Sequence, residues 1–186
     1  MSSKNPWDVR STRIIHNTPW IQLIEDTCVS HGKNIVYTYT RRIDEGPLII
    51  PENENKSLWL VQLYRHPIRR VVWQFPVEGK YIGESWRDAA ERGLKEELGL
   101  VAKEYIDLGE FFPDPGGLDQ KYRPYIARGL SEVTGVHTSE NGEVEDIQKG
   151  KFSRKEIENL IVKGEICDNW TLSALFLYDR YIQSQA

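Results

Sequence analysis

Short stretches in which hydrophobic and polar residues alternate dominate the first part of the chain, and this pattern predicts β-strands. Residues 20–29 alternate over part of their length, and residues 34–43 are rich in β-branched and aromatic side chains. A polar turn at residues 30–33 separates them, so we expect a hairpin that stands beside the main domain. Residues 1–12 are expected to form a loose lead.

Further strands are predicted on both sides of one helical segment. Two apolar stretches precede it, at residues 57–64 and 70–75, and the second ends at Pro76. After the helix the extended stretches are residues 105–112, 122–127 and 144–152.

The helical segment runs from residue 85 to residue 98. Ser85 is placed to cap its first turn, and Gly99 is placed to end it. Apolar residues recur at every fourth position, which predicts one buried face. The residues of that face are Trp86, Ala90, Leu94 and Leu98.

Two more helices are predicted near the end of the chain. Ser153 and Glu156 have the spacing of a capping box, which opens a helix that stops at Gly164. Asp168 or Asn169 caps the last helix. Its expected core residues are Leu172, Leu175, Phe176 and Tyr178.

The order of these elements predicts an α/β fold. Strands, one helix, more strands and two helices are typical of a mixed sheet sandwiched between helices. A length of 186 residues suits one domain with a small appended subdomain.

Charge and composition exclude several classes of function. The net charge of −4 argues against a general nucleic-acid binder, which would carry a basic excess. The polar N-terminus does not resemble a signal peptide, and no run approaches the ~20 apolar residues of a membrane span. Cys28 and Cys167 lack metal-type spacing and are expected to be reduced thiols. We therefore expect a soluble cytoplasmic protein.

The candidate chemistry lies between residues 79 and 100. Glu96 and Glu97 are adjacent on the predicted helix, opposite a glycine-containing loop. In an α-helix they share one side with position 93, because residues three and four apart are neighbours. Carboxylate oxygens of this kind can hold a hard divalent cation such as Mg²⁺ or Mn²⁺.

This stretch resembles the signature of the Nudix hydrolases, G-x5-E-x7-R-E-U-x-E-E-x-G-U, in which U is a bulky aliphatic residue. Seven of the nine specified positions match at the right spacing. They are Glu84, Arg92, Leu94, Glu96, Glu97, Gly99 and Leu100. The resemblance implies an α/β/α sandwich, which agrees with the fold predicted from the pattern.

Two positions depart from the signature. Glu78 stands where the family has its opening glycine, and Gly93 stands where the family has a glutamate that binds metal. Three interpretations stay open: Gly93 is a loss, Glu78 replaces the missing carboxylate, or Glu78 points to solvent while Gly93 eases packing. Glu84 and Arg92 are expected to brace the loop against the helix.

The rest of the chain is similar to the branch of ADP-ribose and nucleoside-diphosphate-sugar pyrophosphatases. The similar sequence segments include LVQLYRHP, GEFFPDPGG and GEICDNWTLSAL. Members of this branch commonly dimerise through extra N-terminal strands. The resemblance thus implies a β-rich dimerisation segment at residues 1–45, a Nudix domain at residues 46–186, and a homodimer.

The resemblance also implies roles for individual residues. Glu96, Glu97 and the backbone carbonyl of Val77 would hold Mg²⁺ or Mn²⁺. Glu145, or else Glu143, would be the catalytic base, and a charged surface turn is the competing interpretation of both. Arg65 and Trp20 would bind the diphosphate and the base of the substrate, although a surface cation and a packed aromatic are the alternatives.

The implied reaction is metal-dependent hydrolysis of ADP-ribose or another nucleoside-diphosphate sugar to a nucleoside monophosphate and a sugar phosphate. The alternative is a Nudix-fold nucleotide-binding or sensing module whose catalysis is weakened at Gly93. No nucleic acid or membrane partner is expected.

Overall fold

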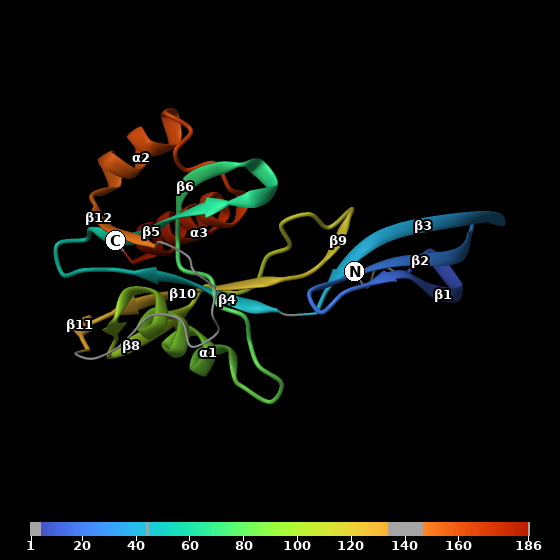
Figure 1. Ribbon diagram of the computed structural model, residues 1–186, viewed down its shortest axis with the longest axis horizontal. Helices are drawn as coiled ribbons and strands as arrows, with labels where there is room; N and C mark the ends of the chain where they lie inside the picture. The colour runs from blue at the N-terminus through green and yellow to red at the C-terminus, as the bar shows by residue number, and fades with distance from the viewer. Residues whose placement is uncertain (1–4, 44, 134–146, 186) are drawn as a thin grey trace. The chain divides into compact units, whose positions relative to one another are not determined.

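The computed structural model describes residues 5–43, 45–133 and 147–185 (Figure 1). These residues form two compact units. The first comprises residues 1–45 together with 112–121, and the second comprises residues 46–111 together with 122–186.

The first unit is built on an antiparallel sheet of three long strands, β1 (Trp7–Asn17), β2 (Ile21–Ser30) and β3 (Lys33–Arg42). The predicted hairpin is confirmed as β2 and β3. Its two turn residues, His31 and Gly32, both have positive φ, as a tight two-residue hairpin turn requires. A short strand, β9 (Leu118–Asp119), adds to β3 in parallel.

The expectation of a loose lead is wrong for residues 7–12, because β1 begins at Trp7. The pairing of β1 with β2 shifts register twice, between Val9 and Ser11 and between Ile14 and His16. Each shift is a bulge that moves the following side chains to the other face. The strand therefore lacks the regular alternation by which strands are predicted.

The second unit contains the mixed sheet. β4 (Gly46–Pro51) runs parallel to β10 (Tyr122–Arg128), and β10 pairs antiparallel with β8 (Glu104–Asp107). A separate antiparallel sheet consists of β12 (Gln148–Phe152), β5 (Leu58–Arg65) and β6 (Arg70–Gln74), with η1 (His66–Ile68) between β5 and β6. A small pair is formed by β7 (Leu100–Val101) and β11 (Ser131–Glu132).

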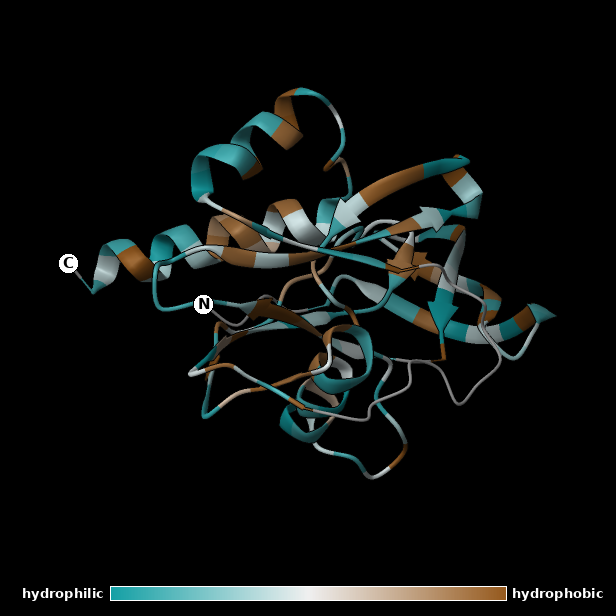
Figure 2. Cartoon of the chain, turned by 60° about the vertical axis from the view of Figure 1, so that its left-hand side comes forward, coloured by the Kyte–Doolittle hydropathy of each residue, from teal (hydrophilic) through white to brown (hydrophobic). Residues whose placement is uncertain are grey.

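Helices cover both faces of β4. Its Leu48 and Ile50 belong to a buried cluster with residues of α2 (Arg154–Val162) and α3 (Asn169–Ser184), whereas Ile49 belongs to a second cluster with α1 (Trp86–Gly93). Successive strand residues point to opposite faces, so this alternation sandwiches the strand between two cores. Figure 2 shows the complementary pattern on the helices, along which hydrophilic and hydrophobic residues alternate. The predicted α/β sandwich with a mixed sheet is confirmed.

Both C-terminal helices begin where the sequence predicts. Ser153 and Glu156 form the reciprocal capping box of α2, and the carboxylate of Asp168 caps α3. The predicted core face of α3 is partly wrong. Leu175 and Tyr178 are buried, but Leu172 and Phe176 are 37% and 64% exposed. Helical periodicity predicts which face of a helix is buried, and Leu172 and Phe176 lie at the edge of that face, where they stay exposed. No helix among the described residues is long and apolar enough to cross a membrane.

The signature helix changes form along its length. α1 ends at Gly93, and residues Leu94–Leu98 continue it as a π-helical turn, η2, which closes at Gly99 with φ of 69°. The prediction of one regular α-helix is therefore wrong for this segment. A π turn bonds residues five apart and is frequent at functional sites. The i,i+4 contact between Arg92 and Glu96 is still made across the change of form.

Candidate active site

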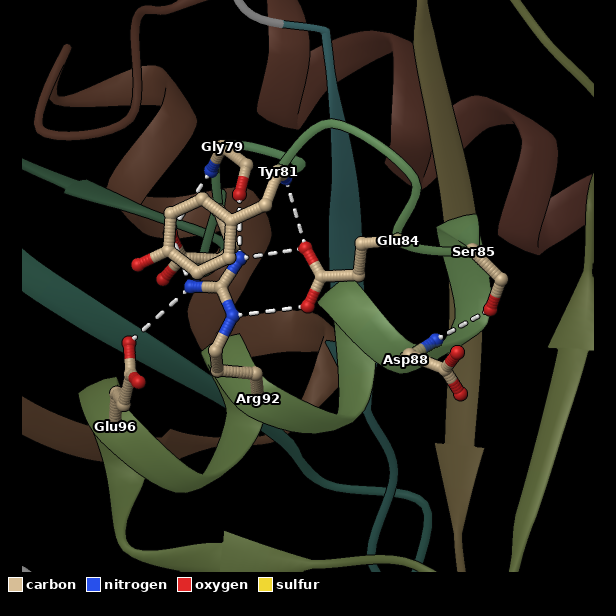
Figure 3. A network of polar contacts seen from close by, with 8 residues as sticks. Gly79, Tyr81, Glu84, Ser85, Asp88, Arg92 and Glu96 are labelled. Carbon is tan, nitrogen blue, oxygen red and sulfur yellow. Dashed lines mark hydrogen bonds and ion pairs between the residues drawn. The ribbon is translucent and has the colours of Figure 1, made fainter.

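The signature loop is fixed to α1 by a single arginine (Figure 3). Arg92 donates from Nε to Oε1 and from Nη2 to Oε2 of Glu84, both at 3.0 Å. Its Nη2 also donates to the backbone carbonyl of Gly79 at 2.6 Å. A bidentate ion pair between a guanidinium and a carboxylate fixes the relative orientation of the two groups. The predicted brace between Glu84 and Arg92 is therefore confirmed.

The same loop covers the arginine. The Tyr81 ring lies over the guanidinium at 4.0 Å, and the Tyr81 amide donates to Glu84 at 2.9 Å. The hydrogen bond from Arg92 is the main reason why the pKa of Glu84 is lowered. Sequence reasoning missed Tyr81. The only signal was an aromatic residue inside a loop that must pack against a charged helix.

Two further carboxylates approach the remaining nitrogen of Arg92. Glu78 Oε1 lies 2.9 Å from Nη1, and Glu96 Oε2 lies 3.4 Å from it. Glu78 comes from the loop and Glu96 from η2, so carboxylates from two elements converge on one cation. Burial is the main cause that raises the pKa of Glu78. The interpretation in which Glu78 simply points to solvent is wrong, since its side chain is 21% exposed and bonded to Arg92.

Of the residues predicted to hold a metal, Glu96 lies at this point. Glu96 is exposed at η2, and Glu97 follows it in a partly buried position. Val77 forms an isolated bridge with Leu48 of β4, which sets the loop backbone beside the sheet. Their role as ligands stays a prediction.

The carboxylates of this loop and helix are of the residue type that a hard divalent cation prefers. Glu78, Glu96 and Glu97 supply carboxylate oxygens, which Mg²⁺ and Mn²⁺ prefer. Within residues 5–43, 45–133 and 147–185, however, no group of three or more His, Cys, Asp or Glu side chains is close enough to hold a metal ion. The predicted bases Glu143 and Glu145 lie outside the described residues.

The two predicted substrate-binding residues belong to different units. Arg65 ends β5 in the second unit, where its Nε donates to Gln74 Oε1 at 2.9 Å and its guanidinium lies 5.9 Å from the centre of the Trp170 ring. Trp20 lies between β1 and β2 in the first unit and is 63% exposed. Arg65 is therefore already hydrogen-bonded through Nε, whereas the Trp20 ring is exposed and could contact a ligand.

Comparison with known proteins gives a consistent result over the whole chain. A family profile described as "NUDIX domain" matches residues 43–166. An ADP-ribose pyrophosphatase of Mycobacterium tuberculosis (strain ATCC 25618 / H37Rv) is 27% identical over 177 residues, which cover 93% of this chain and 83% of the relative. A methanol dehydrogenase activator of Bacillus methanolicus is 26% identical over 162 residues, covering 87% of this chain and 84% of the relative.

A solved structure described as an ADP compounds hydrolase has the same fold. It matches with a TM-score of 0.86 at 20% identity, covering 100% of this chain and 99% of that chain. At this identity the likeness establishes the fold, and the question of substrate depends on the residues of the site.

Proposed function

This chain belongs to the Nudix family and is a Nudix hydrolase, and on that premise we propose that it hydrolyses a nucleoside diphosphate linked to a sugar. ADP-ribose is the first candidate, since an ADP-ribose pyrophosphatase is similar over 93% of the chain. The products would be a nucleoside monophosphate and a sugar phosphate. The observation that carries the proposal is the loop and helix joined by Arg92, around which carboxylates gather.

Each described residue of the site has a proposed task. Arg92 and Glu84 keep the loop in place against α1, so that the loop backbone is ordered before substrate arrives. Glu96, Glu97 and the Val77 carbonyl would hold Mg²⁺ or Mn²⁺. When bound, the cation stabilises charge on phosphate oxygens and acidifies a water ligand. Glu145 or Glu143 would accept the proton of the attacking water.

Two residues are proposed to bind the substrate. The Nη atoms of Arg65 would contact the diphosphate while Nε keeps its bond to Gln74. The Trp20 ring, which is 63% exposed, would stack on the base.

A homodimer formed through the first unit is also part of the proposal. Its strands carry several large apolar side chains on the surface, and such patches usually mark an interface. The most exposed are Val9 (49%), Ile14 (53%) and Val36 (63%). Light scattering at micromolar concentration should give twice the mass of 21.6 kDa, and a monomer mass would remove the dimer from the proposal.

A binding or sensing module without strong catalysis is the second candidate. The observation that favours it is Gly93, which leaves the helix without one carboxylate of the family signature. The hydrolase and the binding module would both bind a nucleotide, and only the hydrolase would turn it over.

A substrate panel separates them. The full chain is incubated with ADP-ribose, GDP-sugars and UDP-sugars in the presence of Mg²⁺ or Mn²⁺, and the phosphate esters released are quantified. If the chain is an enzyme, it should turn over one class of substrate many times. Tight nucleotide binding without product would support the module instead. Glu97→Gln serves as the low-activity variant, and Glu91→Gln, in an exposed pair with Arg87, serves as its matched control.

A further inference from the structure

The first unit contains a pocket that plays no part in the site described above. It lies between the sheet of β1, β2 and β3 and the segment of residues 112–119, whose end, β9, pairs with β3 (Figure 1). Its volume is about 610 Å³, within the range of about 300–1,000 Å³ that is usual for small-molecule sites. Of the described residues that have a task in the proposed reaction, none lines this first-unit pocket.

The sheet side of the first-unit pocket is formed by alternate residues of paired strands. Asp26 of β2 lies opposite Tyr37 of β3, and Cys28 and Tyr39 follow two positions further along their own strands. Residues two apart on a strand share one face, so all four side chains line the same surface. Trp7 of β1 extends this wall, with its ring centre 5.4 Å from that of Tyr37.

The opposite wall is held in place by contacts within the first unit. The Tyr37 hydroxyl donates to the Gly116 carbonyl, and Arg41 Nε donates to Asp119 Oδ2 at 3.1 Å. Phe112 adds a further aromatic ring on this side. The pocket is therefore formed without a ligand, which lowers the cost of ordering the protein when one binds.

The aromatic rings of the first-unit pocket stand at steep angles to one another. The planes of Trp7 and Tyr37 meet at 85°, and those of Tyr37 and Tyr39 meet at 46°. A planar base is sandwiched best between parallel rings, which this pocket lacks. Rings that surround a space at different angles form the aromatic cages that bind quaternary ammonium groups, because the face of each ring carries negative charge.

The charge of the pocket also favours a cation. Its lining includes Asp26 and Asp119 but, among the described residues, no lysine, arginine or histidine. Asp119 is paired with Arg41, whereas Oδ1 of Asp26 is buried and has no hydrogen-bond partner in the part of the chain that the structure describes. Burial, followed by the charge of Asp26, raises the pKa of the Tyr39 hydroxyl. Because buried charges are normally paired, Asp26 lacks a positive partner.

We propose that the first-unit pocket binds an organic ammonium ion. The positive group lies beside Asp26 and against the rings of Tyr37 and Tyr39, and the apolar part of the ligand packs on Trp7 and Phe112. A metal ion does not suit the pocket, since within residues 5–43, 45–133 and 147–185 no three His, Cys, Asp or Glu side chains gather closely enough to hold one. The proposal does not rest on the proposed function, and Asp26 would repel the diphosphate of a nucleotide sugar.

Two probes of equal shape test the need for positive charge. Choline carries a trimethylammonium group, and 3,3-dimethyl-1-butanol has carbon in place of its nitrogen. Each is titrated into the full chain at low salt while NMR follows the Trp7 indole signal, which is assigned with Trp7→Phe. Choline should bind at least about tenfold more tightly than the alcohol, because only choline gains the attraction of the rings and the carboxylate.

Three outcomes of these titrations would overturn the proposal. Equal affinity for the two probes would mean that the pocket is merely apolar. The second outcome is the absence of a saturable shift with choline. The third is that AMP shifts the Trp7 signal and competes with choline, which would identify a nucleotide site instead.

Substitutions then test the residues assigned to the cation. Asp26→Asn keeps the shape of the side chain and should weaken choline binding about tenfold, with no effect on the alcohol. Asp8→Asn is the matched control, because Asp8 lies on the same sheet outside the pocket in an exposed pair with Arg10, and should change the affinity by less than about twofold.

The aromatic part has its own pair of variants. Tyr39→Leu removes a ring face and should weaken choline binding about fivefold, whereas Tyr39→Phe keeps the ring and should retain the affinity within about twofold. Choline affinity that is unchanged in Asp26→Asn or in Tyr39→Leu would contradict the proposal. None of these choline titrations measures hydrolysis, so their failure would leave the proposed reaction untouched, and a chain that binds choline but cleaves no ADP-ribose would refute only the proposed function.

Discussion

Two arginine–carboxylate networks in the second unit have opposite balances of charge. At Glu52, one carboxylate that is 2% exposed accepts from Lys56, from Arg128 and from the Tyr178 hydroxyl, at 2.7 to 2.8 Å. At Arg92, one guanidinium is shared by Glu78, Glu84 and Glu96. The first network surrounds an anion with donors, whereas the second gathers more negative charge than its arginine can balance.

This difference is also seen in the pKa values of the two carboxylates. Burial alone disfavours the charge of Glu52, yet its three hydrogen-bonding partners lower the pKa below the ordinary value. At Glu78, burial outweighs the contact with Arg92 and raises the pKa. Removing a buried anion whose partners are all in place leaves those partners unpaired, which destabilises the fold.

The largest expected effect is on stability at Glu52. Glu52→Ala leaves Arg128 and the buried Tyr178 hydroxyl without their partner, and should lower the free energy of unfolding by about 3 kcal/mol. Urea denaturation measures it. The exposed neighbour Glu54→Ala is the control and should change stability by less than about 0.5 kcal/mol. Mn²⁺ affinity of the folded Glu52→Ala protein should be unchanged, and a tenfold loss would mean that the two networks are not separate.

Glu97→Gln should show the reverse pattern. Loss of a metal-holding carboxylate should lower kcat on ADP-ribose by about 10²-fold, because the cation no longer stabilises charge on the phosphate. The urea midpoint should stay close to that of the natural chain. An unchanged rate would exclude Glu97 from the reaction.

Arg92→Lys tests the geometry of the second network. Lysine keeps the charge but cannot donate to Glu84 through two parallel bonds while also reaching the Gly79 carbonyl. We expect a loss of about 2 kcal/mol in the free energy of unfolding. Faster hydrogen exchange of the loop amides would identify the released segment. Arg87→Lys, in the exposed pair with Glu91, is the matched control and should be nearly silent.

The smallest effect concerns pH. The folded pKa of Glu52 lies below the ordinary value of 4.5, so its contribution is complete above about pH 4.5 and is lost as pH falls through the folded pKa. The stability difference between the natural chain and Glu52→Gln should therefore shrink between pH 6 and pH 3. A difference that stays constant over this range would mean that Glu52 is not preferentially charged in the folded protein.

Much of the fold could be predicted because its signals are local. The capping box at Ser153, the cap at Asp168 and the apolar run of β5 each depend on neighbouring residues. The first half of β1 was not predicted, because register shifts disrupt its alternation, and a π turn as short as Leu94–Leu98 leaves no pattern in the sequence that differs from that of an α-helix.

In the candidate site, too, some contacts could be predicted from the sequence and others could not. The spacing of Glu84 and Arg92 predicted their contact, since the signature fixes both. Glu78 and Gly93 were visible as departures, but excluding a solvent-facing Glu78 needed the loop backbone, which packs against Gly46 and carries the Glu78 side chain over the helix. Tyr81 needed the same backbone to be placed over Arg92.

We propose that this acidic loop and helix hydrolyse a nucleoside-diphosphate sugar. The most direct measurement is ³¹P NMR of ADP-ribose mixed with an excess of the full chain and Mg²⁺, so that even a slow single turnover is visible. If the chain hydrolyses ADP-ribose, the diphosphate resonances should be replaced by those of AMP and a ribose phosphate. Intact ADP-ribose after hours with a folded protein that binds Mn²⁺ would contradict it.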